Sequence, residues 1–277
     1  MIETLLLPFQ LPFLRDALVT ALLVALPCGL LSAFLVMKGW SLIGDAISHA
    51  VLPGVVIAYV LGLPLTVGAF VAGMGSALLT GWLDTNSRVK RDTLMGVVFS
   101  GMFALGIVLI TWIESGVHLD HILFGNLLGV EPHELWTAAA VAAVICVVMA
   151  LRWRDFLLQA FDETQARAAG FRTGWLRNGL LAMISAAVVA ALGAVGIILV
   201  VALLVTPGAT AFLLTRRFGA MLSASAAIAC LSAVTGLYLS IALDTAPGAS
   251  IVVVLTGIFL CALALRTARD RRAPPAE

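Results

Sequence analysis

Charged residues are scarce: Asp, Glu, Lys and Arg make up only 11% of the 277 residues, whereas soluble domains carry roughly 25%. A helix needs about 20 apolar residues to cross the hydrocarbon core of a bilayer, and unpaired backbone groups are costly there. The sequence therefore predicts an all-α, polytopic bundle embedded in the lipid bilayer. Stretches that contain no Asp, Glu, Lys, Arg or His include residues 17–37, 65–83, 94–113, 178–214, 218–243 and 250–265.

Several patterns typical of enzymes are also missing from the sequence. It has no G-x-x-x-x-G-K-[ST] loop, which excludes ATP binding by that loop, and neither H-E-x-x-H nor G-x-S-x-G occurs. The four cysteines are isolated, and none forms a Cys-x-x-Cys pair. The net charge of +1 gives no reason to expect nucleic acid as a partner. We expect a transporter or channel, not an enzyme, with no permanently bound cofactor.

The order of apolar stretches predicts a single transmembrane domain over residues 1–277 with about nine crossings. Two of them fall within 178–214, separated by a turn at 192–197 that contains two glycines; eight crossings remain if this stretch holds a re-entrant piece. Connectors rich in Lys and Arg tend to stay in the cytoplasm, which puts the C-terminus inside. The charged segment from Arg266 onward is expected to be a frayed tail. The other crossings are expected near 17–37, 42–61, 65–83, 94–113, 135–151, 218–242 and 250–266.

One apolar segment carries two ionisable side chains. Asp45 and His49 are four residues apart, so a helix places them on one face, and Pro53 leaves the His49 carbonyl without its helical partner. Ionisable groups inside a bilayer are expensive and mark ion or proton paths unless they simply pair with each other. A carboxylate and an imidazole suit a divalent first-row metal. An Asp–His hydrogen bond, or Asp45 as an N-cap, is the structural alternative.

If Asp45 and His49 bind a metal, further ligands are needed. Two ligands cannot complete a coordination sphere, whereas a two-fold axis through the site would supply two Asp and two His, and symmetric homodimers are the commonest oligomer. The metal hypothesis therefore predicts a second protomer, or ligands from elsewhere in the chain. The connector 114–134 holds His118, His121 and His133, which form either an external metal-gathering surface or a polar interfacial loop.

The longest polar stretch, 152–178, predicts a short cytoplasmic helix near 160–171. Asp162 and Gln165 resemble a capping box, with the helix starting near Glu163, and Gly170 fits the position just past its end. A helix of about two turns is unstable alone. It must dock on the bundle, on the lipid surface or in a groove of a cytoplasmic partner.

Five blocks of the sequence, in order, resemble the permeases of bacterial ATP-binding-cassette importers for manganese, zinc and iron. They are GDAISHAVLPGVVIAYVLGLPLTVGAFVAG (44–73), RDTLMGVVFSGMFALGIVLI (91–110), ILFGNLLGV (122–130), DETQARAAG (162–170) and VGIILVVALLVTPGATAFLL (195–214). The resemblance implies a permease dimer in the cytoplasmic membrane, two copies of a separate cytoplasmic ATP-binding subunit, and an extracytoplasmic metal-binding protein that delivers the ion.

The resemblance also assigns roles to residues. It implies that Asp45 and His49 bind the transported ion, and that the segment with Asp162, Glu163, Ala166 and Gly170 couples the permease to its ATPase. SHAVLPG is more similar to the manganese and iron branch than to the zinc branch. We therefore expect an importer for divalent metal ions, manganese favoured over zinc or iron. The alternatives are a proton-coupled secondary metal transporter and a permease for an organic metal chelate.

Overall fold

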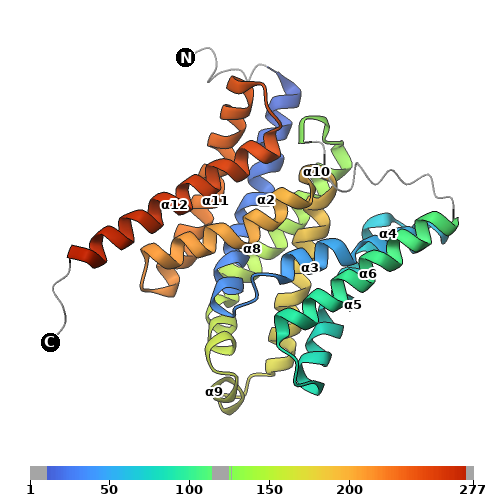
Figure 1. The fold of residues 1–277 in the computed structure, drawn as a ribbon, viewed down its shortest axis with the longest axis horizontal. Helices are drawn as coiled ribbons and strands as arrows, with labels where there is room; N and C mark the ends of the chain where they lie inside the picture. The colour runs from blue at the N-terminus through green and yellow to red at the C-terminus, as the bar shows by residue number, and fades with distance from the viewer. Residues whose placement is uncertain (1–10, 114–124, 126, 273–277) are drawn as a thin grey trace.

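Long α-helices contain all of the charge-free stretches in a computed structural model, which describes residues 11–113, 125 and 127–272. In this part of the chain, eight helical segments are long and apolar enough to cross a membrane, judged by length and composition. The predicted all-α fold is therefore confirmed. The elements are α2 (Pro12–Met37), α3 (Ile43–Ala50), α4 (Leu52–Val60), α5 (Leu65–Asn86), α6 (Arg91–Ile113), the 3-10 helix η1 (Leu127–Gly129), α8 (Pro132–Phe161), α9 (Glu163–Ala168), α10 (Thr173–Leu214), α11 (Phe218–Leu243) and α12 (Pro247–Arg272) (Figure 1).

Helix α10 has 42 residues but is bent at Gly196, whose φ of 77° and ψ of 166° are not helical. Only glycine adopts such a φ at little cost. The chain changes direction at this bend (Figure 1), which lies within the turn predicted at 192–197. Counting the two halves of α10 separately gives nine crossings, and counting α10 as one gives eight.

Two helices are longer than the charge pattern predicts. Helix α8 continues through the polar residues after 151 as far as Phe161, and Arg152 Nη1 donates to Asp155 Oδ2 at 3.0 Å, one helical turn away. Helix α12 continues to Arg272, so the prediction of a frayed tail from Arg266 is wrong for this stretch. Ala and Arg are strong helix formers, and charge alone does not end a helix that leaves the membrane.

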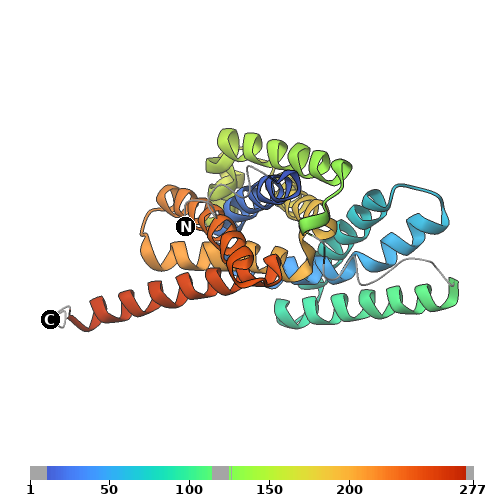
Figure 2. The ribbon, with the colours of Figure 1, turned by 90° about the horizontal axis from the view of Figure 1, so that it is seen from above.

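The centre of the molecule is built from α2 and α10. Helix α10 packs against α2, α8, α11, α12, α3 and α5, and α2 packs also against α8 and α11. Most of the apolar stretch of α2, α3–α4 and α10 is buried inside the molecule, whereas 22% of that of α6, α8 and α12 is buried. Figure 2 shows α12 extending to one side of this centre and α4, α5 and α6 to the other.

Helices α4 and α5 approach each other through two glycines. A Cβ atom on Gly54 would lie 2.1 Å from the carbonyl oxygen of Gly68, and a Cβ on Gly68 would lie 2.2 Å from that of Gly54. Small residues allow helix backbones to come this close in a membrane bundle. Because Gly54 follows α3 by only a few residues, this contact also fixes where α3 lies.

Candidate functional site

Asp45 and His49 lie on α3, an eight-residue helix inside the bundle. Asp45 is in its first turn, where the helix dipole favours a negative charge, and His49 is in its last turn. Nε2 of His49 lies 3.5 Å from Oδ1 of Asp45, and the two side chains are 26% and 37% exposed. The spacing thus places both groups together, within reach of a small ion.

The helical hydrogen bonding is interrupted between α3 and α4. Helix α3 ends at Ala50, and Val51 separates it from α4, whose second residue is Pro53. Proline has no N–H, so it cannot bond to the carbonyl four residues earlier, which belongs to His49. The break therefore leaves a carbonyl oxygen near the imidazole without its usual helical partner.

Two aromatic rings of α6 contact the His49 ring. The ring centroid of Phe99 lies 5.5 Å from that of His49 with a tilt of 36°, and the centroid of Phe103 lies 5.1 Å away in an edge arrangement of 83°. Nδ1 of His49 is buried and has no hydrogen-bond partner among the described residues. Ser48, beside it, is occupied by its own helix, since its Oγ donates to the Gly44 carbonyl at 2.7 Å.

Asp45 and His49 form a close pair of ionisable side chains at this place. No group of three or more His, Cys, Asp or Glu side chains suited to a metal occurs among the described residues. A metal with four protein ligands at this place would therefore need further donors, either from a second copy of the chain or from elsewhere in the same chain.

The remaining histidines divide into two cases. His118 and His121 lie outside the described residues. His133 is exposed at the start of α8, where its Nδ1 lies 3.1 Å from Glu131 Oε2. Glu131 and Glu134 form a capping box, with the backbone N–H of Glu131 donating to Glu134 Oε2 at 3.2 Å. Glu131 and Glu134 thus stabilise a helix start, and a metal-gathering role for His133 stays a prediction.

A short helix, α9, lies in the range predicted for the coupling segment, at the lower end of the molecule in Figure 1. The backbone N–H of Gln165 donates to Asp162 Oδ1 at 2.9 Å, and the side chain of Ala166 is fully buried. Gly170 has a φ of 85° just after the helix. These residues form a capped turn; its role in coupling stays a prediction.

A polar clamp joins α9 to the start of α10. Arg167 donates through Nη2 to Glu163 Oε1 at 2.6 Å and through Nε to Thr173 Oγ1 at 3.1 Å. The bond from Arg167 lowers the pKa of Glu163, and the bond from the Gln165 amide lowers the pKa of Asp162. Both carboxylates therefore favour the folded turn in their ionised form.

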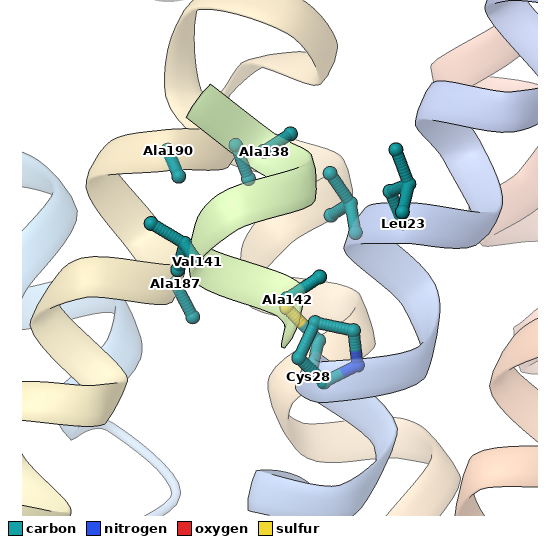
Figure 3. A pocket seen from close by; sticks show the side chains of 10 residues that line it. Leu23, Cys28, Ala138, Val141, Ala142, Ala187 and Ala190 are labelled. Carbon is teal, nitrogen blue, oxygen red and sulfur yellow. The ribbon is translucent and has the colours of Figure 1, made fainter. Parts of the chain in front are cut away.

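A small hollow lies between α2, α8 and α10 (Figure 3), and neither Asp45 nor His49 lines it. Apart from the thiol of Cys28, its lining is apolar, so it offers no set of ligands for an ion; it consists of Leu23, Val24, Pro27, Cys28, Ala138, Val141, Ala142, Ala187, Ala190 and Ala191.

Sequence reasoning missed the aromatic pair and the clamp. Phe99 and Phe103 are four residues apart, so a shared helix face was visible in the sequence. Nothing in the sequence says that this face meets α3, because that contact depends on how the helices pack. Likewise, the i, i+4 spacing of Glu163 and Arg167 was visible, but the bond from Arg167 to Thr173 was not.

Comparison with known proteins adds a consistent set of similarities. The sequence profile described as the ABC 3 transport family matches residues 10–266. The chain is 48% identical to a protein of Haemophilus influenzae named "Probable iron transport system membrane protein", over 98% of this chain and 100% of the relative. It is 45% identical to the manganese transport system membrane protein MntB of Synechocystis, over 92% and 84%. The structure of PsaBC from Streptococcus pneumoniae in complex with Fab matches with a TM-score of 0.84 and 36% identity, covering 95% of both chains.

Proposed function

Since the chain belongs to the ABC 3 transport family, we propose that it forms the membrane pathway of an importer for divalent transition-metal ions. It is a multi-pass membrane subunit of a bacterial ABC transporter, not an enzyme. The metal is cargo that passes through, so no permanently bound cofactor is part of the proposal. The observation that carries it is the Asp45–His49 pair on α3, within a segment that otherwise lacks charge.

The chemistry of the pair supports a divalent first-row metal. Carboxylate oxygen suits manganese, and imidazole suits iron and zinc, so a mixed set binds any of these ions. The relatives reported above carry both iron and manganese in their names. We infer manganese as the favoured cargo because the segment SHAVLPG is more similar to the manganese and iron branch than to the zinc branch, and uptake competition among manganese, ferrous iron and zinc tests this choice.

The assembly we propose has three kinds of partner. A second copy of this chain supplies the other Asp45 and His49, a cytoplasmic ATP-binding subunit docks on α9, and an extracytoplasmic protein delivers the metal. Docking on α9 is supported by its position at one end of the molecule and by its attachment to both α8 and α10. Asp162, Glu163, Ala166 and Gly170 shape this docking element within a single transmembrane domain.

The test is metal uptake by cells that express the permease with its partner subunits. Asp45→Ala and His49→Ala are each expected to abolish manganese uptake, since each removes a ligand, while the complex still assembles. Asp155→Ala, a carboxylate of α8 outside the pair, serves as a matched control with uptake near that of the native chain. Native uptake by both site variants at normal expression would refute the ligand assignment.

A second experiment separates this function from proton-coupled secondary transport. The chain alone, reconstituted into liposomes with a pH gradient, is expected to take up no manganese, because import requires ATP hydrolysis by the partner subunit. Gradient-driven uptake by the chain alone would favour a proton relay through Asp45 and His49.

A further inference from the structure

His49 differs from most histidines that bind metals in proteins. In such sites the ring nitrogen that does not bind the metal almost always donates its N–H to a carboxylate, carbonyl or water, which fixes the ring and makes it a stronger ligand. If Nε2 of His49, which faces Asp45, binds the ion, this second nitrogen is Nδ1. Nδ1 is buried, and no described residue forms a hydrogen bond with it. The ring must be held in another way.

Among the described residues, the aromatic rings that contact His49 are two phenylalanines of α6. Phe99 and Phe103 lie one helical turn apart on α6, which packs directly against α3. One ring is tilted and the other meets the imidazole edge-on, at centroid distances of 5.5 and 5.1 Å, within the favourable range for aromatic pairs. Contacts from two directions restrict rotation of the imidazole about its side-chain bonds.

We propose that Phe99 and Phe103 are positioning residues of the transport site, which hold the His49 ring by aromatic contact in place of a hydrogen bond to Nδ1. The inference rests on the proposed function, in which Asp45 and His49 bind the transported ion. A resident metal site gains from a hydrogen-bonded second nitrogen, because that bond increases affinity. A transport site must also release its ion. Aromatic contact orients Nε2 toward the ion, but it does not increase the metal affinity of the imidazole as a hydrogen bond to Nδ1 would.

The first arm of the test removes the contact. Phe99→Leu and Phe103→Leu keep an apolar side chain but lose the ring, so the imidazole is less well oriented. In the complete transport complex, the KM for Mn²⁺ uptake is expected to rise about 10-fold, the lower end of the effect of changes around metal ligands, with a smaller change in Vmax. Phe212→Leu, which replaces an exposed phenylalanine on α10, is the matched control and leaves KM unchanged.

The second arm supplies the missing hydrogen bond. Phe99→Gln and Phe103→Gln each bring a carbonyl oxygen near the imidazole, and the variant that reaches Nδ1 is expected to bind Mn²⁺ more tightly and release it more slowly. KM and Vmax then both fall. If the two rings only supported the fold, Vmax would be lower in every variant. KM would then not rise in the Leu variants and fall in the Gln variants.

The outcomes separate this inference from the proposed function. Each variant is first compared with the native chain for its amount in the membrane and for the ATPase activity of the purified complex, so a variant that fails to assemble is replaced by Phe→Met at the same position. The inference is overturned if KM stays native in the Leu or Met variants and in both Gln variants. The proposed function still stands in that case, provided that Asp45→Ala and His49→Ala abolish uptake. Native uptake in those two alanine variants overturns both.

Discussion

Two glycines determine how closely the chain can pack beside the proposed ion site. Gly54 and Gly68 place the backbones of α4 and α5 in direct contact, with each missing Cβ lying where the other helix has a carbonyl oxygen. Gly54 stands next to Pro53, which ends the helical bonding of His49. The position of His49 therefore depends on the lack of a side chain at Gly54 as well as on the side chains that contact His49.

We predict that Gly54→Ala destabilises the permease. The new Cβ would lie 2.1 Å from the Gly68 oxygen, so the helices must separate, and overpacking of this kind typically costs about 1–3 kcal/mol. Thermal unfolding of the purified protein in detergent should show a lower midpoint. Gly75→Ala is the control on α5, because its Cβ meets no atom within 4 Å and alanine favours helix. Equal midpoints for the two variants would contradict the packing argument.

At the scale of elements, α9 is a short helix that cannot be stable by itself. It is stabilised by the Asp162 cap, by burial of Ala166 and by Arg167, which connects Glu163 to Thr173 at the start of α10. A force applied to α9 by a docked subunit would therefore reach α8 and α10 directly, through the chain and through this clamp.

Replacing Gly170 tests whether the end of α9 matters for coupling. Its φ of 85° is unfavourable for any residue with a Cβ, although no atom lies within 4 Å of the added group. Gly170→Val should shift α9 and raise the ATP hydrolysed per metal ion imported several-fold, with the bundle still folded. A Cβ atom added at Gly174 also meets no atom within 4 Å, and the φ of Gly174 is ordinary, so Gly174→Val should keep native coupling. If Gly170→Val leaves the ATP hydrolysed per metal ion imported unchanged, α9 does not couple ATP hydrolysis to transport.

The pH dependence of α9 follows from its two carboxylates. The pKa of Asp162 is lowered by the bond from the Gln165 amide, and the pKa of Glu163 by the bond from Arg167. Their contribution to stability is present above the pKa values of the unfolded segment and is lost as the pH falls through the lower values of the folded one. Hydrogen exchange at residues 162–168 should therefore speed up, relative to an unstructured peptide, below about pH 4.

Asp162→Asn is the matched variant for this measurement, because asparagine caps helices about as well as aspartate but does not titrate. It should reduce the acid-induced loosening at the cap and leave only the part that comes from Glu163. If the variant loosens over the same pH range and to the same extent as the native chain, Asp162 is not the cause.

At the scale of the whole molecule, the central helices α2 and α10 are mostly buried, while most residues in the apolar stretches of α6, α8 and α12 are at least partly exposed. Such surfaces suit lipid and a second protomer. A site shared by two protomers predicts that one altered copy is enough to stop transport. In a tandem fusion of two chains, Asp45→Ala in either half should reduce manganese uptake to near background, whereas half-maximal uptake would mean that each chain carries its own site.

The sequence predicted what depends on local spacing and missed what depends on packing. The apolar stretches, the i, i+4 placement of Asp45 and His49 and the bend near 192–197 follow from helix geometry and glycine. The contact of Phe99 and Phe103 with His49, the Gly54–Gly68 approach and the bond from Arg167 to Thr173 join different helices. The continuation of α12 to Arg272 was missed because charge indicates where a membrane ends, and a helix can continue beyond it.

The most direct test of the central claim is a structure of the dimeric complex soaked with manganese, with anomalous scattering measured at the manganese and zinc edges. We expect one manganese peak on the two-fold axis, bound by a carboxylate oxygen of Asp45 and Nε2 of His49 from each chain. A peak bound by other residues, or one bound by a single chain, would contradict it.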